Sequence, residues 1–360
     1  MSLARMQASL HAQLDGKTVG YAYTVGNRAL VSGSGGWART SADGTPQPFT
    51  AQTRLTVASV SKWITAIATM AVLQQRDVSL DAPIGPYLPP DWEVPPYLRS
   101  LTFAELLTHT TGIKDFGSGP QPYDRLHRFF TRAVRADATT RCAGARVTDP
   151  PDPVTPSDRA RCYSNYNFAI LRLLLPRVAG FPEAPNRSAR ADTLAAQYER
   201  LVQERVFQPV GIRGPACQPQ GNRYAFAYFH PGDKPGHDWG DVRLRCGDAG
   251  WYVSAEEMAR VLRSVVSRDG RILVETAAYS SYADLRTRGL ISTSAAIFGP
   301  TVGPRVIAVL FINSDIIDGP RDRARGILQK AYDEAKLPAP VAGAGENPIA
   351  QHVHRFTPLR

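Results

Sequence analysis

Ser59 and Lys62 combine a nucleophile and a candidate base at a spacing that a helix brings onto one face. A serine hydroxyl is a weak nucleophile at neutral pH, and a lysine beside it can act as a base when apolar surroundings disfavour the charged amine. This spacing also occurs by chance on exposed helices. Here the flanking residues Leu55, Val57 and Ile64 are apolar, which favours a buried helix. Burial of a lysine costs free energy, so a lysine in such a helix indicates a function. The run therefore predicts the nucleophile pair of a serine acyl-transfer enzyme.

A second polar group, Tyr163-Ser164-Asn165, comes directly before an apolar stretch. A tyrosine close to a lysine cation can exchange protons with a serine or with a leaving group. An amide such as Asn165 can hold the lysine through its oxygen and donate to a substrate carbonyl. The alternative is an ordinary helix start, where Asn is a favoured cap, and for this group taken alone that alternative is the simpler one.

The elements that must position these groups follow from the periodicity. Residues 18–57 alternate apolar and polar side chains with glycine-rich interruptions, which predicts a hairpin and a short strand. From Ser59 to about Gln75 the apolar residues recur at helical spacing, so Ser59 lies at a strand-to-helix junction. The same criteria predict helices over 102–108 (opened by a capping box), 166–177, 191–207, 255–266 and 322–336, and strands over 289–298 and 306–313.

Strands at both ends of the chain and helices between them predict an α/β (α+β) fold with one sheet built from both ends. No internal repeat or clean linker divides the sequence, so we expect a single domain over residues 1–360. Its expected parts are a sheet subdomain at about 1–74 and 250–337, a mostly helical subdomain at about 75–249, and a mobile tail at 338–360.

Composition narrows the class of protein. Hydrophobic residues make up 43% of the chain and charged residues 21%, as in folded globular proteins. The longest apolar stretch, 63–73, is too short for a transmembrane segment. The net charge of +10 comes with scattered arginines and without a nucleic-acid motif, so we expect a basic surface and a small-molecule or peptide substrate, anionic if anything, rather than nucleic acid. No motif for a nucleotide cofactor, a phosphate loop or a metal is present, so no cofactor is expected.

The four cysteines fall into two pairs, Cys142 with Cys162 and Cys217 with Cys246, each enclosing a loop rich in Pro, Arg, Asp and Gly. Their spacing does not suit zinc. Two disulfides are favoured, and four unpaired thiols are the alternative. Residues 1–5 lack the features of a signal peptide. With disulfides, the expectation is an exported protein, periplasmic or secreted, whose leader is absent from this chain; a cytoplasmic location is the alternative.

Taken together, these motifs resemble the serine β-lactamase-like and penicillin-binding-protein superfamily, in its branch of class C β-lactamases, esterases and D-aminopeptidases. The likeness extends over about residues 18–336, and the run 106–113 is the most specific part of it. The segments that carry it are Ala58-Ser59-Val60-Ser61-Lys62, Val78-Ser79-Leu80-Asp81-Ala82-Pro83, Leu106-Leu107-Thr108-His109-Thr110-Thr111-Gly112-Ile113, Tyr163-Ser164-Asn165, Val210-Gly211-Ile212, 250–260 and 306–313.

The resemblance implies a β-lactamase/transpeptidase-like fold, with an antiparallel sheet flanked by helices and a helical insertion. It implies that Ser59 is acylated, that Lys62 and Tyr163 share the acid and base work, and that Asn165 contacts the substrate amide. The backbone amide of Ser59 then contributes one donor of the oxyanion hole. The position of His109 is structural in this family.

The third motif of the family, Lys-Thr-Gly or His-Thr-Gly, aligns with Arg286-Thr287-Arg288. Arg286 and Thr287 keep a cation and a hydroxyl that suit a substrate carboxylate. Arg288 replaces the glycine against which substrate lies, so we expect a narrowed cleft. A shifted register is the alternative explanation.

Two functions follow. The first is a serine hydrolase or acyltransferase that acts through an acyl-enzyme on Ser59, with an ester, an amide, a D-amino-acid peptide or a β-lactam as substrate. The alternative is a catalytically impaired relative that binds a ligand or partner in the old cleft.

Overall fold

The computed structural model describes residues 1–113, 119–128, 130–131, 163–183, 189–229, 235–266, 278–285, 289–299, 305–316 and 323–337. Of residues 266, 278–285, 289–290 and 323 it describes the backbone alone. Cys142, Cys162, Arg286, Thr287, Arg288 and the tail from 338 therefore lie outside the described residues.

The main sheet joins the two ends of the chain. Its strands are all antiparallel and run in the order β3-β2-β1-β8-β7-β6. They are β1 (Gly20–Gly26), β2 (Leu30–Arg39), β3 (Gln47–Pro48), β6 (Ala278–Leu285), β7 (Gly289–Phe298) and β8 (Val306–Ile312). In the middle of the sheet β1 pairs with β8, so Tyr21 lies opposite Ile312. A short ladder of β4 (Leu55–Thr56) and β5 (Tyr252–Val253) lies outside this sheet.

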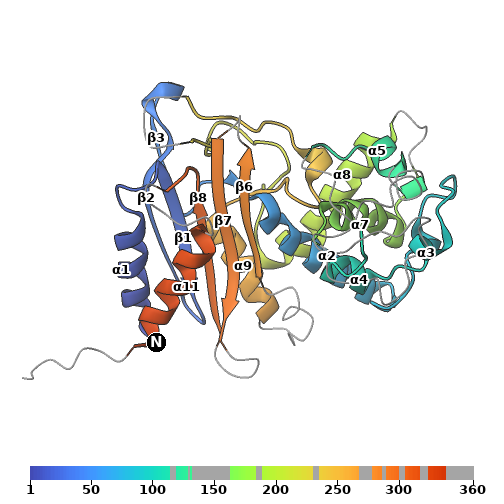
Figure 1. Cartoon of the computed structure of the whole chain (residues 1–360), viewed down its shortest axis with the longest axis horizontal. Coiled ribbons are helices and arrows are strands. Elements are labelled where there is room, and N and C mark those ends of the chain that lie inside the picture. The colour runs from blue at the N-terminus through green and yellow to red at the C-terminus, as the bar shows by residue number, and fades with distance from the viewer. Residues whose placement is uncertain are drawn as a thin grey trace, which may run out of the picture.

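β8 explains why helices cover both faces of the sheet. All of its residues are buried, and as a strand buried on both faces it is a continuous apolar run. Ile307, Val309 and Phe311 belong to the large core that also contains α9 (Ala255–Val266). Ala308 and Leu310, which point the other way, pack with α1 (Leu3–Leu14) and α11 (Arg323–Lys336). Figure 1 shows α1 and α11 on one face of the sheet and α9 on the other.

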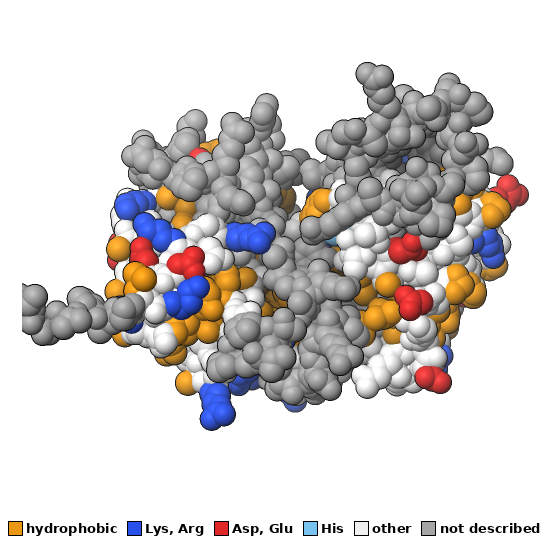
Figure 2. Space-filling model, turned by 60° about the horizontal axis from the view of Figure 1, so that its bottom comes forward, with side chains coloured by type: hydrophobic (Ala, Val, Ile, Leu, Met, Phe, Trp, Pro, Cys, Tyr) orange, Lys and Arg blue, Asp and Glu red, His pale blue; other side chains and the backbone are white. Residues whose placement is uncertain are grey.

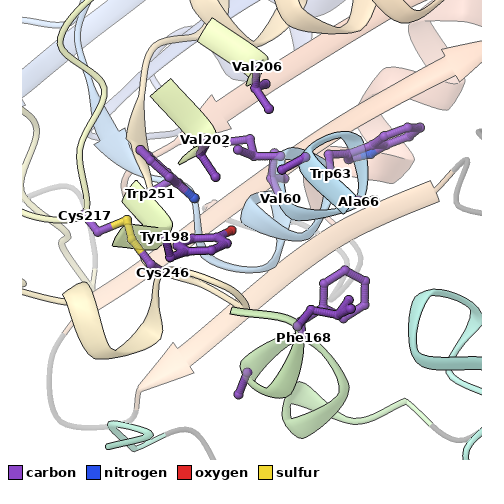
Figure 3. Close-up of a cluster of buried hydrophobic side chains, with 14 of the residues drawn as sticks. Val60, Trp63, Ala66, Phe168, Tyr198, Val202, Val206, Cys217, Cys246 and Trp251 are labelled. Carbon is purple, nitrogen blue, oxygen red and sulfur yellow. A yellow bond between two sulfur atoms is a disulfide. The ribbon is translucent and has the colours of Figure 1, made fainter. Parts of the chain in front are cut away.

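The remaining described helices gather beside the sheet, on the side of β6 (Figure 1). They are α2 (Ser61–Gln75), α3 (Pro96–Arg99), α4 (Phe103–Thr108), α5 (Tyr123–Arg128), α7 (Asn165–Val178) and α8 (Arg190–Val202). α2 and α7 pack through mostly buried residues in one hydrophobic core, part of which is drawn in Figure 3. At the start of α4, Thr102 and Glu105 form the predicted capping box: the Glu105 amide donates to Thr102 Oγ1 at 3.2 Å and the Thr102 amide to Glu105 Oε2 at 2.8 Å.

The expected fold class is confirmed, and the predicted helix at 255–266 and strand at 289–298 have the bounds that the structure shows. Two of the longer elements were missed. The first is α1, although Met6, Leu10 and Leu14 are buried at helical spacing. The second is β6, whose Ser, Ala and Tyr residues give only a weak alternation. The division into sheet and helical subdomains with boundaries near 75 and 250 stays a prediction.

The distribution of surface charges and the lengths of the helices are relevant to the partners that were expected. Among the described residues of the face in Figure 2, Lys and Arg side chains lie between Asp and Glu side chains. On α11, Lys336 Nζ pairs with Asp333 Oδ1 at 2.7 Å. Within the described part of the chain, no helix has the length and apolar character needed to cross a bilayer.

Candidate active site

Ser59, the predicted nucleophile, lies in a strained turn between β4 and α2. Ala58, the residue before Ser59, has a φ of 44°, a left-handed conformation that non-glycine residues seldom adopt and that clusters at active sites. The residue before it, Val57, is fixed from two directions: its amide donates to the Trp251 carbonyl at 2.9 Å, and its carbonyl accepts from Thr293 Oγ1 at 2.9 Å. The 3-10 turn η2 (Ala58–Val60) lies beside β6 and β7. The sheet therefore holds the backbone that presents Ser59.

Ser59 Oγ has two close partners. Lys62 Nζ donates to it from one helical turn away at 2.9 Å, and Tyr163 Oη lies 2.6 Å from it. Lys62 is completely buried and Ser59 is 8% exposed, whereas Tyr163 is 48% exposed. A lysine buried this deeply is consistent with the expectation from its apolar flanks.

Lys62 is held by three acceptors. Besides Ser59 Oγ, its ammonium donates to Asn165 Oδ1 at 2.7 Å and to the Asp248 carbonyl oxygen at 2.8 Å. An ammonium has three N–H donors, so this arrangement uses all of them. Nζ also lies 5.0 Å from the centroid of the Tyr163 ring, within the range of a cation–π contact. These contacts fix the direction in which the amine faces Ser59.

The start of α7 places Tyr163 and Asn165. Ser164 caps this helix, since its side chain accepts from the Tyr166 amide at 3.3 Å. The Ser164 amide in turn donates to His109 Nδ1 at 3.2 Å. The buried His109 ring packs against the Tyr163 ring, with centroids 4.7 Å apart. His109 thus makes the hydrogen-bonded packing contacts expected of it, among them the direct contact with the Tyr163 ring.

Buried charges surround the Asp248 carbonyl. The Asp248 side chain is fully buried and pairs with Arg245, whose Nε lies 3.1 Å from Asp248 Oδ2. Arg172 on α7 is also buried. Burial lowers the pKa of the Arg172 guanidinium to about 10, and the negative charge of Asp248 opposes that shift. The backbone behind Lys62 is therefore tied into a buried ionic network.

The structure brings four of the predicted site residues together: Ser59, Lys62, Tyr163 and Asn165 form one hydrogen-bonded group. The predicted third motif, 286–288, lies outside the described residues, between the end of β6 and the start of β7. Two features of the site were missed. The first is β6 beside η2, because the sequence of β6 gave only a weak strand signal. The second is the Asp248 carbonyl that accepts from Lys62, which no sequence signal could reveal because every residue has a carbonyl.

The predicted bond between Cys217 and Cys246 is confirmed, and both cysteines are buried. The other predicted pair, Cys142 with Cys162, lies outside the described residues. Glu199 lies close to the two bonded sulfurs. A cysteine binds metal as a thiolate, so while the disulfide is intact this group does not offer a metal site.

The fold and the serine–lysine–tyrosine group are those of a β-lactamase-like protein, and comparison with known proteins agrees. The family model described as "Beta-lactamase" matches residues 4–296, and the chain belongs to that family. The expected resemblance is thereby confirmed.

Two curated relatives share parts of the sequence. The chain is 24% identical to the D-alanyl-D-alanine-carboxypeptidase/endopeptidase AmpH of Escherichia coli (strain K12) over 218 residues, 59% of this chain and 49% of AmpH. It is 28% identical to the esterase EstB of Burkholderia gladioli over 281 residues, 71% of this chain and 67% of EstB. The match thus spans about half the length of AmpH.

Solved structures confirm the fold. A class C β-lactamase from Rhodobacter sphaeroides superposes with a TM-score of 0.60 at 19% identity, over 91% of this chain and 98% of that one. A D-amino acid amidase from Ochrobactrum anthropi SV3 superposes with a TM-score of 0.60 at 16% identity, over 92% and 97%. At these identities the likeness establishes the fold alone.

Proposed function

We propose that this protein is a serine hydrolase or acyltransferase that acts through an acyl-enzyme on Ser59. One observation carries the proposal: Ser59 Oγ is within hydrogen-bond distance of both Lys62 Nζ and Tyr163 Oη. The proposed substrate is an ester, an amide, a D-amino-acid peptide or a β-lactam. The names of the relatives, a carboxypeptidase and an esterase, support this range.

The contacts suggest how the proton moves. With its three N–H donors engaged, the Lys62 ammonium donates to Ser59 Oγ, which leaves Tyr163 Oη to receive the serine proton. Ser59 Oγ bonds to the substrate carbonyl carbon and its proton passes to Tyr163 Oη, while the phenol proton of Tyr163 passes to the leaving group as the bond between that group and the carbonyl carbon breaks. Water or an amine then attacks the acyl-enzyme by the reverse route, and the serine regains its proton.

The remaining roles concern substrate binding. We assign the Ser59 backbone amide to the oxyanion hole, because this residue lies within the turn η2 that leads into α2. Asn165 uses its oxygen to hold Lys62, so its amide nitrogen is the group that we assign to a substrate carbonyl. We assign recognition of a substrate carboxylate to Arg286 and Thr287, with Arg288 narrowing the cleft.

The site weighs against the alternative of an impaired relative that only binds a ligand. A protein that has lost catalysis has no need to keep a fully buried lysine aimed at a serine, because burial of an ammonium costs free energy. The left-handed Ala58 before the nucleophile is a second cost of this kind. Both features are expected where the geometry of Ser59 is used.

A fluorophosphonate probe tests the proposal. We expect a phosphonyl adduct on the peptide that contains Ser59, detected by mass spectrometry, and no adduct in Ser59→Ala. Ser100→Ala makes the same change at an exposed serine and should label like the wild type. A panel with a fluorescent penicillin and a nitrophenyl ester then separates the substrate classes. Absence of any adduct in the wild type would favour the binding alternative.

We also propose that the protein functions in an oxidising compartment outside the cytoplasm. The support is the buried Cys217–Cys246 disulfide, because such bonds persist mainly in exported proteins. Peptide mapping without reductant, on protein isolated from its native cell fraction, tests this. The same map tests the proposed pairing of Cys142 with Cys162.

A further inference from the structure

The segment Cys246–Asp248 binds the helix that carries the proposed catalytic lysine. The Asp248 carbonyl accepts from Lys62 Nζ at 2.8 Å. The preceding carbonyl, of Gly247, accepts from Thr65 Oγ1 at 2.6 Å. Thr65 follows Lys62 on α2, and both side chains are completely buried. Two successive peptide carbonyls thus hold α2 from the same side.

The other side of this segment is packed against α7, the helix that begins with Asn165. A Cβ atom on Gly247 would lie 2.4 Å from the Phe168 carbonyl oxygen and 2.8 Å from Arg172 Cβ. These distances leave no room for a side chain, and one of the neighbours is backbone that cannot rotate away. Residues 246–248 are therefore wedged between the two helices that carry the proposed catalytic groups.

The disulfide anchors the beginning of the segment. Cys246 is bonded to Cys217, which is itself fixed: its amide donates to Glu199 Oε1 at 2.7 Å, and its carbonyl accepts from the Val242 amide at 2.9 Å. Figure 3 shows the disulfide beside Tyr198, whose hydroxyl lies 2.6 Å from Thr65 Oγ1. The bond thus links α8 and its neighbours to the backbone behind Lys62.

We propose that the Cys217–Cys246 disulfide is a positioning element for catalysis, which fixes the Asp248 carbonyl and through it the direction of Lys62. This inference rests on the proposed function. The disulfide touches no reacting atom. Its effect is expected on the rate of the acyl-transfer step, because displacement of a catalytic group by about 1 Å can cost on the order of 100-fold in rate. Binding of substrate, which uses other groups, should change little.

The double variant Cys217→Ser/Cys246→Ser tests the proposal. In wild type, fluorophosphonate labelling of Ser59 is measured first, and its absence overturns the proposed function rather than this inference. With labelling present, we expect kcat and the labelling rate of the variant to fall by about 10- to 100-fold while KM stays within about twofold. Circular dichroism at the assay temperature shows whether the variant is folded. A folded variant with unchanged kcat and labelling rate overturns the inference.

If the double variant does not fold, reduction of the folded Cys142→Ser/Cys162→Ser variant decides the question, because this variant keeps only Cys217 and Cys246. Tris(2-carboxyethyl)phosphine reduces the bond between them, and alkylation counts the two thiols. We expect kcat to fall on reduction and to return on reoxidation, and a kcat that does not respond to reduction overturns the inference. Gly247→Ala, with the disulfide intact, should lower kcat in the same way because the wedge must shift. Gly326→Ala on α11, where a Cβ meets nothing within 4 Å, should leave kcat unchanged.

Discussion

Tyr163 Oη lies 2.6 Å from Ser59 Oγ, although 104 residues separate them in the sequence. The tyrosine ring is half exposed and packs on the buried ring of His109, while the serine is nearly covered. The ring is therefore placed by its packing, and its hydroxyl serves the serine. Because the ring and the hydroxyl of Tyr163 have different roles, a substitution can remove the hydroxyl and keep the ring.

Tyr163→Phe should lower kcat by about 100- to 10,000-fold, the range that a positioned proton-transfer group contributes, with a smaller effect on KM. The ring and its stacking remain, so the free energy of unfolding should change by less than about 0.5 kcal/mol. Steady-state kinetics and urea unfolding measure the two effects. Tyr332→Phe on α11 is the matched control, far from the site in the chain and in the fold. A variant with wild-type kcat would remove Tyr163 from the mechanism.

Asp248→Asn tests the buried ionic network behind Lys62. The change leaves the backbone carbonyl in place but removes the negative charge that faces the buried Arg172 and pairs with Arg245. Uncompensated buried charges cost about 3–5 kcal/mol, so urea unfolding should show a loss of this size. Asp241→Asn, which breaks an ion pair of partly exposed groups with Arg243, should cost less than about 1 kcal/mol. Equal losses in the two variants would contradict this account.

The sequence predicted those parts of the site that depend on the types and spacing of residues along the chain. Ser59 and Lys62 were predictable because one helical turn joins them, and Cys217 with Cys246 because the loop between them suits a bridge. The contact of Lys62 with the Asp248 carbonyl was not predictable, since it depends on backbone placed by tertiary packing. A contact with a backbone carbonyl does not depend on the type of residue, so no residue in the sequence indicates it.

The glycines of β2 were also predicted wrongly. Within residues 18–57, the glycines Gly33 and Gly35 were interpreted as interruptions between strands, and this was wrong. In the structure both lie inside β2, directly opposite Tyr23 and Tyr21 of β1. They are small because the tyrosine rings cover them, and that reason becomes visible only once the register of the two strands is known.

Glu199→Gln should change how stability depends on pH. Burial raises the pKa of the Glu199 carboxyl above its usual 4.5, and the amide of Cys217 only partly opposes this. The folded protein then binds this proton more tightly than the unfolded chain, so the stabilisation it gives is present below pH 4.5 and is lost as pH rises through the folded pKa. Glutamine keeps the oxygen acceptor and carries no charge. We therefore expect the variant to be more stable than wild type at pH 7.

Urea unfolding as a function of pH, at constant ionic strength, measures this difference. The two unfolding free energies should converge as the pH falls below 4.5, because wild-type Glu199 is then protonated in both states. A difference that stays constant across the pH range would show that the charge of Glu199 is not its cause.

Gly33→Ala tests the explanation given for the glycines of β2. A Cβ atom there would lie 2.3 Å from Tyr23 Oη and 2.4 Å from its Cζ, so the ring would have to move. That ring is restrained, because Tyr23 Oη lies 3.0 Å from His11 Nε2 on α1 and the ring stacks on Tyr21. Overpacking of this kind costs about 1–3 kcal/mol, and urea unfolding should show a loss in that range.

Two further variants make the cause specific. Gly326→Ala places the same methyl group in open space within α11 and should raise the unfolding free energy by about 0.5–1 kcal/mol, because alanine is favoured over glycine inside a helix. Tyr23→Leu removes the ring oxygen and the far side of the ring. In the Tyr23→Leu background, Gly33→Ala should lower the unfolding free energy clearly less than it does in wild type, because the added methyl group no longer clashes with a tyrosine ring. An equal cost in both backgrounds would place the strain elsewhere than between Gly33 and Tyr23.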